Sequence, residues 1–189
     1  MRQTILDLCG GTGAWSQPYR DSGYNVINVT LPEYDVLTYK PPDNIHGILA
    51  APPCTEFSLA AGKKLAKRNP EKGLILIKAC LDIIWRCMPE FWALENPVGF
   101  LRRFLGQPTF TFRQWEFGDR GIKPTDLWGY FNIPKKSVFT RPEKKDLLYI
   151  AAGGSRKRAT RIKGVDYRQS IIAAKTPSGF ANAFYNANK

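Results

Sequence analysis

The chain has 189 residues, of which 43% are hydrophobic and 13% aromatic, and its formal net charge is +12. This composition fits a globular protein with one filled core; it excludes a disordered chain, and no apolar run approaches the ~20 residues of a membrane-spanning helix. The first apolar stretch contains Asp7 and no small-residue cleavage site follows it, which argues against secretion. We therefore expect a single cytoplasmic domain, whose basic surface either binds an acidic partner such as nucleic acid or only aids solubility.

The first hundred residues alternate short apolar runs with turns and helical stretches. A long helix is expected after Asn69, a good N-cap followed by proline, and it continues to Met88. It is apolar almost all round, apart from a polar stripe of Lys78, Asp82 and Arg86, so we expect it to be largely buried against a sheet. This alternation predicts an α/β domain with a mostly parallel sheet. The expected strands are 5–9, 24–29, 45–51 and 91–95, with a short helix at 15–20.

The second half of the chain changes character. Two more strands are expected at 109–112 and 127–131. Residues 132–168 are rich in Lys, Arg, Pro and Gly and follow no clear pattern. A last helix, capped by Thr176 and opened by Pro177, presents one apolar face and is expected to pack on the core.

A glycine-rich turn follows the first strand, in the run Asp7-Leu-Cys-Gly-Gly-Thr-Gly13. A strand that leads through such a turn into a helix brings backbone N–H groups to the carboxyl end of a sheet, where α/β folds bind nucleotides. The run lacks the third glycine of the dinucleotide fingerprint and the Lys-Ser/Thr of a phosphate loop. A cofactor without a polyphosphate, above all S-adenosylmethionine, fits this turn best, and an ordinary tight turn is the alternative.

One cysteine and one carboxylate lie at the ends of expected strands. The four cysteines and one histidine show no metal-ligand spacing, so no metal site is expected. Cys54 lies in the stiff, polar loop Pro52-Pro-Cys-Thr-Glu-Phe-Ser58, where nearby cations would raise its thiolate fraction. Glu95 of Glu95-Asn-Pro97 ends the fourth strand at the same edge, where a partly buried carboxyl group can hold or donate a proton. A helix cap or a surface acid is the alternative interpretation of Glu95.

Three ordered motifs resemble those of the DNA (cytosine-5) methyltransferases. The run Asp7-Leu-Cys-Gly-Gly-Thr-Gly-Ala-Trp-Ser16 resembles their cofactor loop. Pro53-Cys-Thr-Glu-Phe-Ser-Leu-Ala-Ala-Gly62 is similar to their nucleophile loop, and Glu95-Asn-Pro97 resembles their acidic motif. Order and spacing agree as well over residues 1–100. The run from Arg168 to Phe184 loosely resembles the C-terminal helix that such enzymes pack against the cofactor.

The resemblance implies a Rossmann-like methyltransferase fold that depends on S-adenosylmethionine, and a covalent mechanism. Cys54 would add to C6 of cytosine, and Glu95 would hold N3 and the exocyclic amine, so that C5 becomes nucleophilic and accepts the methyl group. The target base must leave its stack to reach such a pocket. Trp15 either packs on the cofactor or belongs to the core. The cofactor-binding residues that the resemblance implies are Asp7, Gly11, Gly13, Trp15, Asp35 and Pro53.

The sequence departs from the family's pattern at several positions. Cys9 stands where the family usually has Phe. Thr30 stands where the family has the acidic residue that binds the cofactor ribose; Glu33 is nearby as a candidate substitute, and the ribose contact stays open. The family's Gln-x-Arg-x-Arg motif is missing, which leaves Arg120 or Lys123 as the cation near the substrate. There is also no room for a sizeable target-recognition region, so we expect relaxed sequence specificity or a protein partner that supplies target recognition.

Basic residues cluster between Arg156 and Lys163, with five cations in eight positions. Such a run is either a solvated loop or a phosphate-binding surface, and the motifs that point to DNA favour the second. A second candidate for phosphate contact follows the nucleophile loop directly, with Lys63, Lys64, Lys67 and Arg68, and Arg102 and Arg103 are candidates to extend this surface. The nucleic-acid-binding residues that we expect are Ser58, Lys63, Lys64, Arg156, Arg158 and Arg161.

We therefore predict one methyltransferase domain over residues 1–189. The catalytic motifs lie in 1–100, a basic and partly irregular substrate-facing region in 101–168, and a closing helix at 176–188. The predicted substrate is cytosine in DNA. We expect this DNA either to be single-stranded or to be recognised with relaxed sequence specificity. Two alternatives stay open: methylation of RNA or a free cytosine nucleotide, and a catalytically silent relative that binds nucleic acid. The presence of both Cys54 and Glu95 argues against a silent relative.

Overall fold

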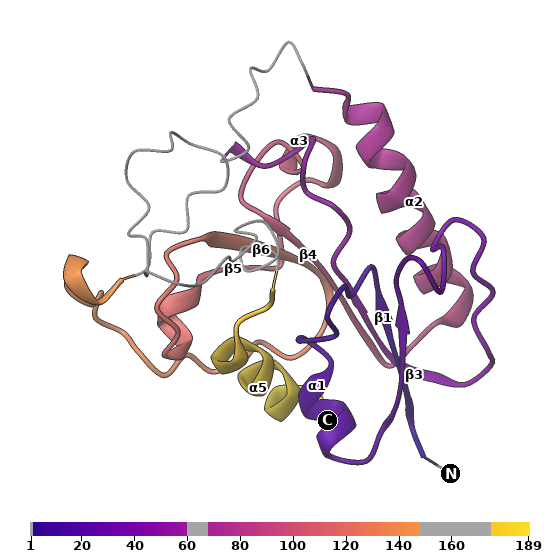
Figure 1. Cartoon of the computed structure of the whole chain (residues 1–189), viewed down its shortest axis with the longest axis horizontal. Coiled ribbons are helices and arrows are strands. Elements are labelled where there is room, and N and C mark those ends of the chain that lie inside the picture. Colours follow the sequence, from indigo (N-terminus) through magenta and orange to yellow (C-terminus); the bar gives the residue numbers. More distant parts are fainter. Residues whose placement is uncertain (1, 60–67, 148–174) are drawn as a thin grey trace.

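One central sheet is covered by helices on both faces. The computed structural model describes three stretches of the chain, residues 2–59, 68–147 and 175–189. In Figure 1 the long helix α2 (Pro70–Cys87) lies on one side of the sheet. The short helices α1 (Gln17–Asp21) and α5 (Ser178–Ala187) lie on the other side. Within the described residues, no helix is long and apolar enough to cross a membrane.

The sheet has six strands in the order β2-β1-β3-β4-β6-β5. The pairs β1–β2, β1–β3 and β3–β4 are parallel, whereas β4–β6 and β6–β5 are antiparallel. The prediction of an α/β fold with a mostly parallel sheet is therefore confirmed. The strands are β1 (Thr4–Leu8), β2 (Asn25–Val29), β3 (Ile45–Ala50), β4 (Phe91–Pro97), β5 (Phe110–Arg113) and β6 (Pro124–Tyr130).

Two hydrophobic cores form because side chains alternate between the two faces of each strand. On β1, Leu6 and Leu8 join the core under α2, whereas Ile5 joins the core under α1 and α5. On β6, Trp128 faces the first core and Leu127 the second. Both faces of the sheet are thus covered, which explains why the parallel strands are continuous apolar runs.

The sequence of strand connections places several chain segments at one edge of the sheet. Strand β1 lies between β2 and β3, so the chain runs from β1 to a neighbour on one side and then crosses to a neighbour on the other side. Open α/β sheets bind ligands at such a switch point. The carboxyl ends of β1, β3 and β4 meet at this edge because the three strands are parallel. The antiparallel register pairs Pro97 with Thr125 and Arg113 with Pro124. The start of β6 and the end of β5 therefore reach the same edge.

Helix α2 begins as its sequence predicts, but one of its faces is left uncovered. The Asn69 side chain accepts a hydrogen bond from the backbone N–H of Lys72 at 3.0 Å, which confirms it as the N-cap. Only one stripe of the helix, including Ile77 and Cys80, contacts the sheet. The expectation of a largely buried helix is therefore wrong, because α2 packs on one face of one sheet. Ile75 and Trp85 are exposed on the opposite side.

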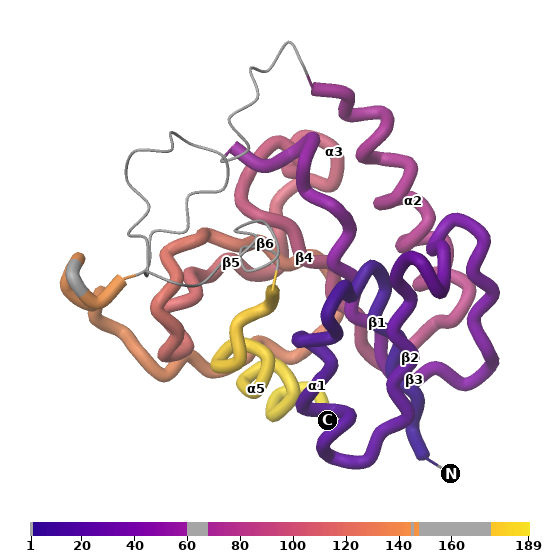
Figure 2. Tube along the Cα trace, in the orientation of Figure 1, coloured from indigo at the N-terminus to yellow at the C-terminus, as the bar shows by residue number. Residues whose placement is uncertain are grey.

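Helix α5, from the end of the chain, lies beside α1, from its beginning (Figure 2). The helix begins at Ser178 with Pro177 as N-cap, and Thr176 makes no capping hydrogen bond, so the predicted cap is wrong. The Asp119 carboxylate accepts from the first helical amides instead, those of Gly179 and Phe180, at 3.4 and 3.2 Å. A residue 60 positions away in the chain therefore satisfies the start of α5.

Candidate active site

The glycine turn at the end of β1 wraps around two polar side chains, the buried Asp7 and the half-buried Asn28. Gly11 and Gly13 both have positive φ, 53° and 69°, which glycine adopts at little cost. A Cβ added at Gly10 would lie 2.4 Å from Oδ1 of Asp7 and 2.5 Å from Oδ1 of Asn28. Only a glycine at this position lets the turn close over the two side chains.

These two side chains each keep one oxygen without a hydrogen-bond partner among the described residues. Ser16 Oγ donates to Oδ2 of Asp7 at 2.6 Å, but Oδ1 of Asp7 is buried and unpartnered. Asn28 Nδ2 donates to the carbonyl oxygen of Gly11 at 3.0 Å, and its Oδ1 is likewise buried and unpartnered. Burial raises the pKa of Asp7 to about 6, against the opposing effects of Ser16 and Arg20. The turn therefore offers two acceptor oxygens to a ligand that donates hydrogen bonds.

The other expected cofactor residues differ in their surroundings. Asp35 is exposed, and its Oδ1 accepts from the backbone N–H of Leu37 at 3.0 Å. Its charge also acts on the pKa of the Cys9 thiol in the glycine turn, so it lies near that turn. Pro53 is exposed beside Cys54. Trp15 is only 2% exposed and packs on an aromatic ring of α5 with ring centroids 5.3 Å apart, which favours its reading as a core residue.

The loop that carries Cys54 is held at several points. The carbonyl oxygen of Cys54 accepts from the backbone N–H groups of Phe57 and Ser58, at 3.0 and 2.8 Å. Asn96, next to Glu95 on β4, donates from Nδ2 to the carbonyl oxygen of Pro52 at 3.1 Å. Ser58 is only 4% exposed, so the structure places this expected DNA contact inside the loop.

Arg68 also holds this loop. Its guanidinium donates to the carbonyl oxygens of Glu56 at 3.1 Å and Ser58 at 2.7 Å, and it lies 5.3 Å from the ring centroid of Phe100. The expectation that Arg68 belongs to a phosphate-binding surface is therefore wrong, because two of its nitrogens bind the loop instead. Cys54 is thus presented by a loop fixed from both β4 and the start of α2.

Cys54 lies within electrostatic reach of one cation and one carboxylate. Lys123 Nζ lies 3.7 Å from Oε1 of Glu95, and the charges of both groups act on the Cys54 thiol. Burial raises the pKa of Cys54 and outweighs the lowering effect of Lys123. The expected cation is therefore present, but the resting thiol is harder to ionise than an exposed one.

Of the two candidate cations, Lys123 is the one that lies beside Glu95. Arg120 Nε donates to the carbonyl oxygen of Asp146 at 2.9 Å, away from Glu95, whereas Lys123 pairs with Glu95. Sequence reasoning could not separate them because they are close together in a segment without clear periodicity. The antiparallel entry of β6 beside β4 decides in favour of Lys123.

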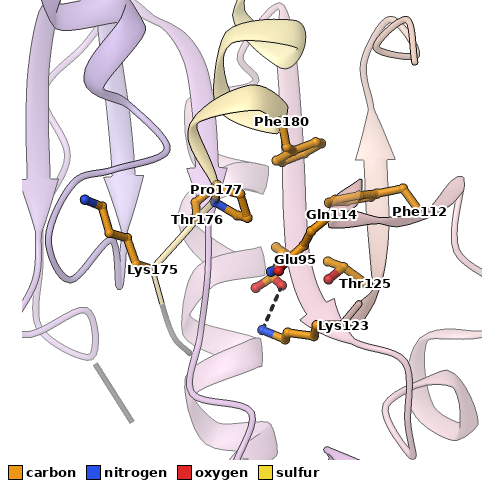
Figure 3. Close-up of a pocket in the computed structure, with 9 residues that line it drawn as sticks. All are labelled: Glu95, Phe112, Gln114, Lys123, Thr125, Lys175, Thr176, Pro177 and Phe180. Atoms are coloured by element: carbon orange, nitrogen blue, oxygen red, sulfur yellow. Dashed lines mark ion pairs between the residues drawn. The ribbon is translucent and has the colours of Figure 1, made fainter. Parts of the chain in front are cut away.

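A small cavity of about 10 Å³ lies beside Glu95 (Figure 3). Its volume is roughly that of a single water site, so a pyrimidine ring enters only if the walls separate. Within the part of the chain that the structure describes, no group of His, Cys, Asp and Glu could hold a metal ion. The cavity is lined by Glu95, Phe112, Gln114, Lys123, Thr125, Lys175, Thr176, Pro177 and Phe180.

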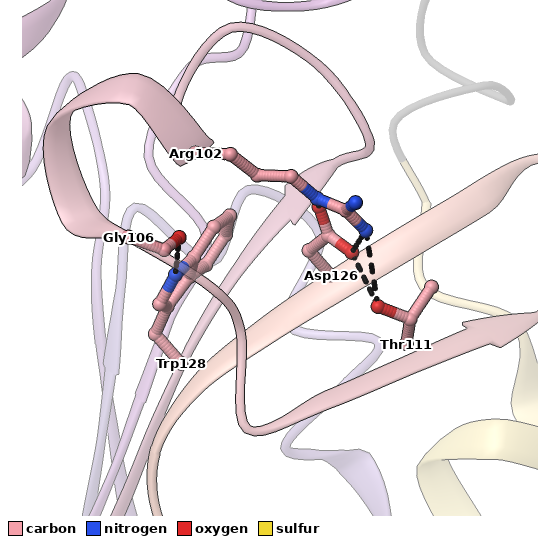
Figure 4. Close-up of polar contacts among 5 residues, drawn as sticks. All are labelled: Arg102, Gly106, Thr111, Asp126 and Trp128. Carbon is pink, nitrogen blue, oxygen red and sulfur yellow. Dashed lines mark hydrogen bonds and ion pairs between the residues drawn. The ribbon is translucent and has the colours of Figure 1, made fainter.

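Arg102 has a structural role. Its Nε and Nη2 donate to the two carboxylate oxygens of Asp126, each at 2.7 Å, and Asp126 is fully buried (Figure 4). Thr111 Oγ1 donates to the same carboxylate at 2.6 Å. The expectation that Arg102 extends a phosphate-binding surface is therefore wrong, because its guanidinium neutralises a buried acid.

Five expected nucleic-acid contacts lie outside the described residues: Lys63, Lys64, Arg156, Arg158 and Arg161.

The comparisons with known proteins give two curated relatives, whereas no protein-family model matches the chain. The chain is 26% identical over 121 residues to the "Type II methyltransferase M.DdeI" of Desulfomicrobium norvegicum, a match that covers 51% of this chain and 28% of that protein. It is 29% identical over 147 residues to the "Probable DNA (cytosine-5)-methyltransferase" of Frog virus 3, covering 66% of this chain and 69% of that one. The chain thus spans less than a third of the length of one relative and about two thirds of the other.

A solved structure supports the fold. A crystal structure described as a prophage-encoded DNA modification methyltransferase (E. coli) superposes with a TM-score of 0.51 and 16% sequence identity. The match covers 69% of this chain and 49% of that one, and at this identity it is informative about the fold alone. The resemblance seen in the three motifs is confirmed by these similarities: the chain is similar to DNA (cytosine-5) methyltransferases and has the fold of a methyltransferase.

Proposed function

We propose that the protein methylates C5 of cytosine in DNA, with S-adenosylmethionine as the methyl donor. One observation carries the proposal: Cys54, Glu95 and Lys123 meet at the sheet edge that also presents the glycine turn and its two unpartnered acceptor oxygens. Both curated relatives are named as methyltransferases, and the name of the Frog virus 3 relative supports DNA as the substrate and C5 of cytosine as the acceptor atom.

The residues of the glycine turn suit S-adenosylmethionine. Its ribose hydroxyls, ammonium group and adenine amine are all hydrogen-bond donors, which the orphaned Oδ1 atoms of Asp7 and Asn28 can accept. Glycines in the turn allow close approach of the backbone, and Asp35 and Pro53 flank it. When bound, the cofactor supplies an electrophilic methyl group. Asn28 was not among the cofactor-binding residues expected from the sequence. Its position on β2, beside the glycine turn, is nevertheless one from which a side chain can reach a ligand in the turn.

The first chemical step activates the ring. The Cys54 thiolate forms a bond to C6, the C5=C6 π bond opens, and the electron pair moves through C4 to N3 and O2. Glu95 places its carboxyl proton on N3, so that no full charge remains on the ring. Lys123 stabilises the Cys54 thiolate before attack, because its charge lowers the pKa that burial raises.

The second step transfers the methyl group and releases the enzyme. The enamine formed by the addition makes C5 nucleophilic, and C5 accepts the methyl group. Loss of the C5 proton then restores the C5=C6 bond and expels the Cys54 thiolate, and N3 returns its proton. The balance is one cytosine and one methyl donor converted to 5-methylcytosine, demethylated cofactor and one proton.

The test uses the purified full chain and S-adenosylmethionine with a tritiated methyl group. We expect label in cytosine-containing DNA with wild type and none with Cys54→Ser, while calorimetry gives the same cofactor affinity for both. Cys87→Ser, at a half-buried cysteine outside this site, is the matched control and should keep activity. Retained turnover in Cys54→Ser would overturn the covalent mechanism.

The same assay separates the possible substrates. Duplex DNA, single-stranded DNA, RNA and a free cytosine nucleotide are offered in parallel, and we expect transfer to DNA. DNA with 5-fluorocytosine should form a denaturation-resistant adduct with wild type, because fluorine at C5 does not leave as a proton does. Label only in RNA or in the nucleotide would reject DNA as the substrate. No label in any of the four substrates would reject the proposal that the protein is a methyltransferase.

A further inference from the structure

Gln114 is a buried amide that neither the motifs nor the proposed mechanism uses. It is the first residue of the 3-10 helix η3 (Gln114–Phe117), directly after β5, and it is only 8% exposed. Its side chain lines the same small cavity as Glu95 and Lys123, and Figure 3 shows it reaching toward Glu95. Within the described part of the chain, its amide makes no side-chain hydrogen bond, and its polar atoms are accessible at the cavity.

Gly121 fixes the position of this amide. A Cβ added at Gly121 would lie 1.6 Å from Oε1 and 2.7 Å from Cδ of Gln114. The backbone N–H of Trp115 donates to the carbonyl oxygen of Gly121 at 3.0 Å, which holds the two segments together. The amide oxygen thus packs against a residue without a side chain, and the NH₂ group is the end left to donate into the cavity. The amide is not sealed in the core but opens onto the cavity, so its NH₂ group is available to a ligand that enters there.

The order of the strands indicates which atom of the base this amide meets, given the proposed function. From the cofactor turn toward β5, the sheet presents β1, then Cys54 after β3, Glu95 on β4, Lys123 before β6 and Gln114 after β5. Methyl transfer requires C5 of the base to face the cofactor side. In a pyrimidine, C2 lies directly across the ring from C5. The carbonyl oxygen O2 therefore points away from the cofactor, toward the side where Lys123 and Gln114 lie.

We infer that Gln114 is a substrate-binding residue whose amide NH₂ donates a hydrogen bond to O2 of the target cytosine, beside Lys123. This inference rests on the proposed function. When sulfur adds to C6, part of the displaced electron pair resides on O2, so the hydrogen bond strengthens as the adduct forms. A donor that is positioned before the reaction lowers the barrier to addition, as in an oxyanion hole.

The first test removes the donor. Gln114→Leu keeps the approximate volume and deletes the NH₂ group, and Gln107→Leu, at an exposed glutamine in the loop before β5, is the matched control. We expect kcat on DNA to fall about 10²-fold for Gln114→Leu, with cofactor affinity unchanged and with an equal fall in the rate of 5-fluorocytosine trapping. Gln107→Leu should match wild type. Unchanged kcat in Gln114→Leu would overturn the inference.

The second test changes the base and needs no variant to be fully active. An oligonucleotide with 2-thiocytosine at the target carries sulfur in place of O2, a much weaker hydrogen-bond acceptor. Wild type should lose rate on this substrate, whereas Gln114→Leu should respond to the change much less. Equal oxygen-to-sulfur rate ratios in the two proteins would show that Gln114 does not contact O2.

Two further variants separate a structural role from this contact. Gly121→Ala leaves Gln114 in place but displaces its amide, so it should reproduce the fall in kcat and the reduced response to 2-thiocytosine. Gln114→Glu is close in shape but presents no amide donors, and it should lower kcat while it keeps the cofactor affinity. If wild type neither methylates nor traps DNA, the proposed function fails and this inference with it. If wild type does both and these variants equal it, only the inference fails.

Discussion

Asp7 illustrates how burial of one carboxyl group makes stability depend on pH. Its pKa is raised to about 6 from an ordinary value of 3.8, so the folded protein holds the proton more tightly than the unfolded chain. Its contribution to the free energy of unfolding is therefore most favourable below about pH 4. It declines as the pH rises from about 4 to about 6, and it stays constant above that.

Asn at position 7 cannot ionise. We predict that the stability of Asp7→Asn, measured relative to wild type, is higher at pH 7 than at pH 4. The raised pKa corresponds to about 3 kcal/mol of unfolding free energy that wild type loses over this interval. Urea unfolding of both proteins without cofactor at pH 4 and pH 7 measures it, with Asp21→Asn, at an exposed acid, as the control. A stability difference that is the same at both pH values would show that Asp7 does not titrate in this range.

Lys123 controls the reactivity of Cys54 in our second prediction. Its charge lowers the pKa of the Cys54 thiol, so Lys123→Met should shift the pH profile of Cys54 alkylation by iodoacetamide to higher pH. Arg120→Met removes a cation that pairs elsewhere and should leave the profile unchanged. The modified cysteine is identified by mass spectrometry of peptides. An unshifted profile in Lys123→Met would mean that this lysine does not act on the nucleophile.

At the scale of elements, one ion pair joins the short helix α3 (Arg102–Leu105) to β6. Arg102→Ala would leave the fully buried Asp126 carboxylate with only Thr111 as a partner among the described residues. We expect the free energy of unfolding to fall by about 3 kcal/mol, near the lower end of the range for breaking a buried pair. Arg103→Ala, at the exposed neighbour, should change stability far less. Equal midpoints of thermal unfolding for the two variants would contradict this role of Arg102.

The sequence predicted elements well where the signal is local. Asn69 caps α2 because its side chain reaches an amide three residues ahead, and such a signal is legible in the sequence. The predicted cap of α5 was wrong because Asp119, a distant residue, satisfies its first amides in place of Thr176. The uncovered face with Trp85 was also missed, since periodicity cannot tell how many layers a helix contacts.

At the scale of the whole molecule, the net charge of +12 leads to a prediction about DNA binding. Direct base readout needs a scaffold beyond the catalytic pocket, and phosphate contacts carry no sequence information. We expect affinity for DNA to fall steeply with salt, and the isolated chain to methylate with relaxed specificity. Bisulfite sequencing of methylated plasmid DNA measures the specificity, and a sharp recognition site of four or more base pairs would refute it.

The basic run is tested by the slope of affinity against salt. Neutralising Arg156, Arg158 and Arg161 should lower the slope of log affinity against log salt by about one unit for each phosphate that the chain no longer binds. Neutralising three cations of α2, Lys72, Lys78 and Arg86, is the control with the same change in charge. If both sets of variants flatten the slope equally, only net charge matters and the run is no binding surface.

The sequence by itself determined the fold class and the edge of the sheet at which chemistry is possible. Asp7, Cys54 and Glu95 each lie at or just beyond the end of an apolar run, and parallel strands bring such ends together whatever the loops between them do. Only the tertiary structure decided that Lys123 and Gln114 join Glu95, and that burial raises the pKa of Cys54. These outcomes depend on the antiparallel register of β5 and β6 and on how much chain covers each group, and neither long-range pairing nor desolvation is written in a local pattern.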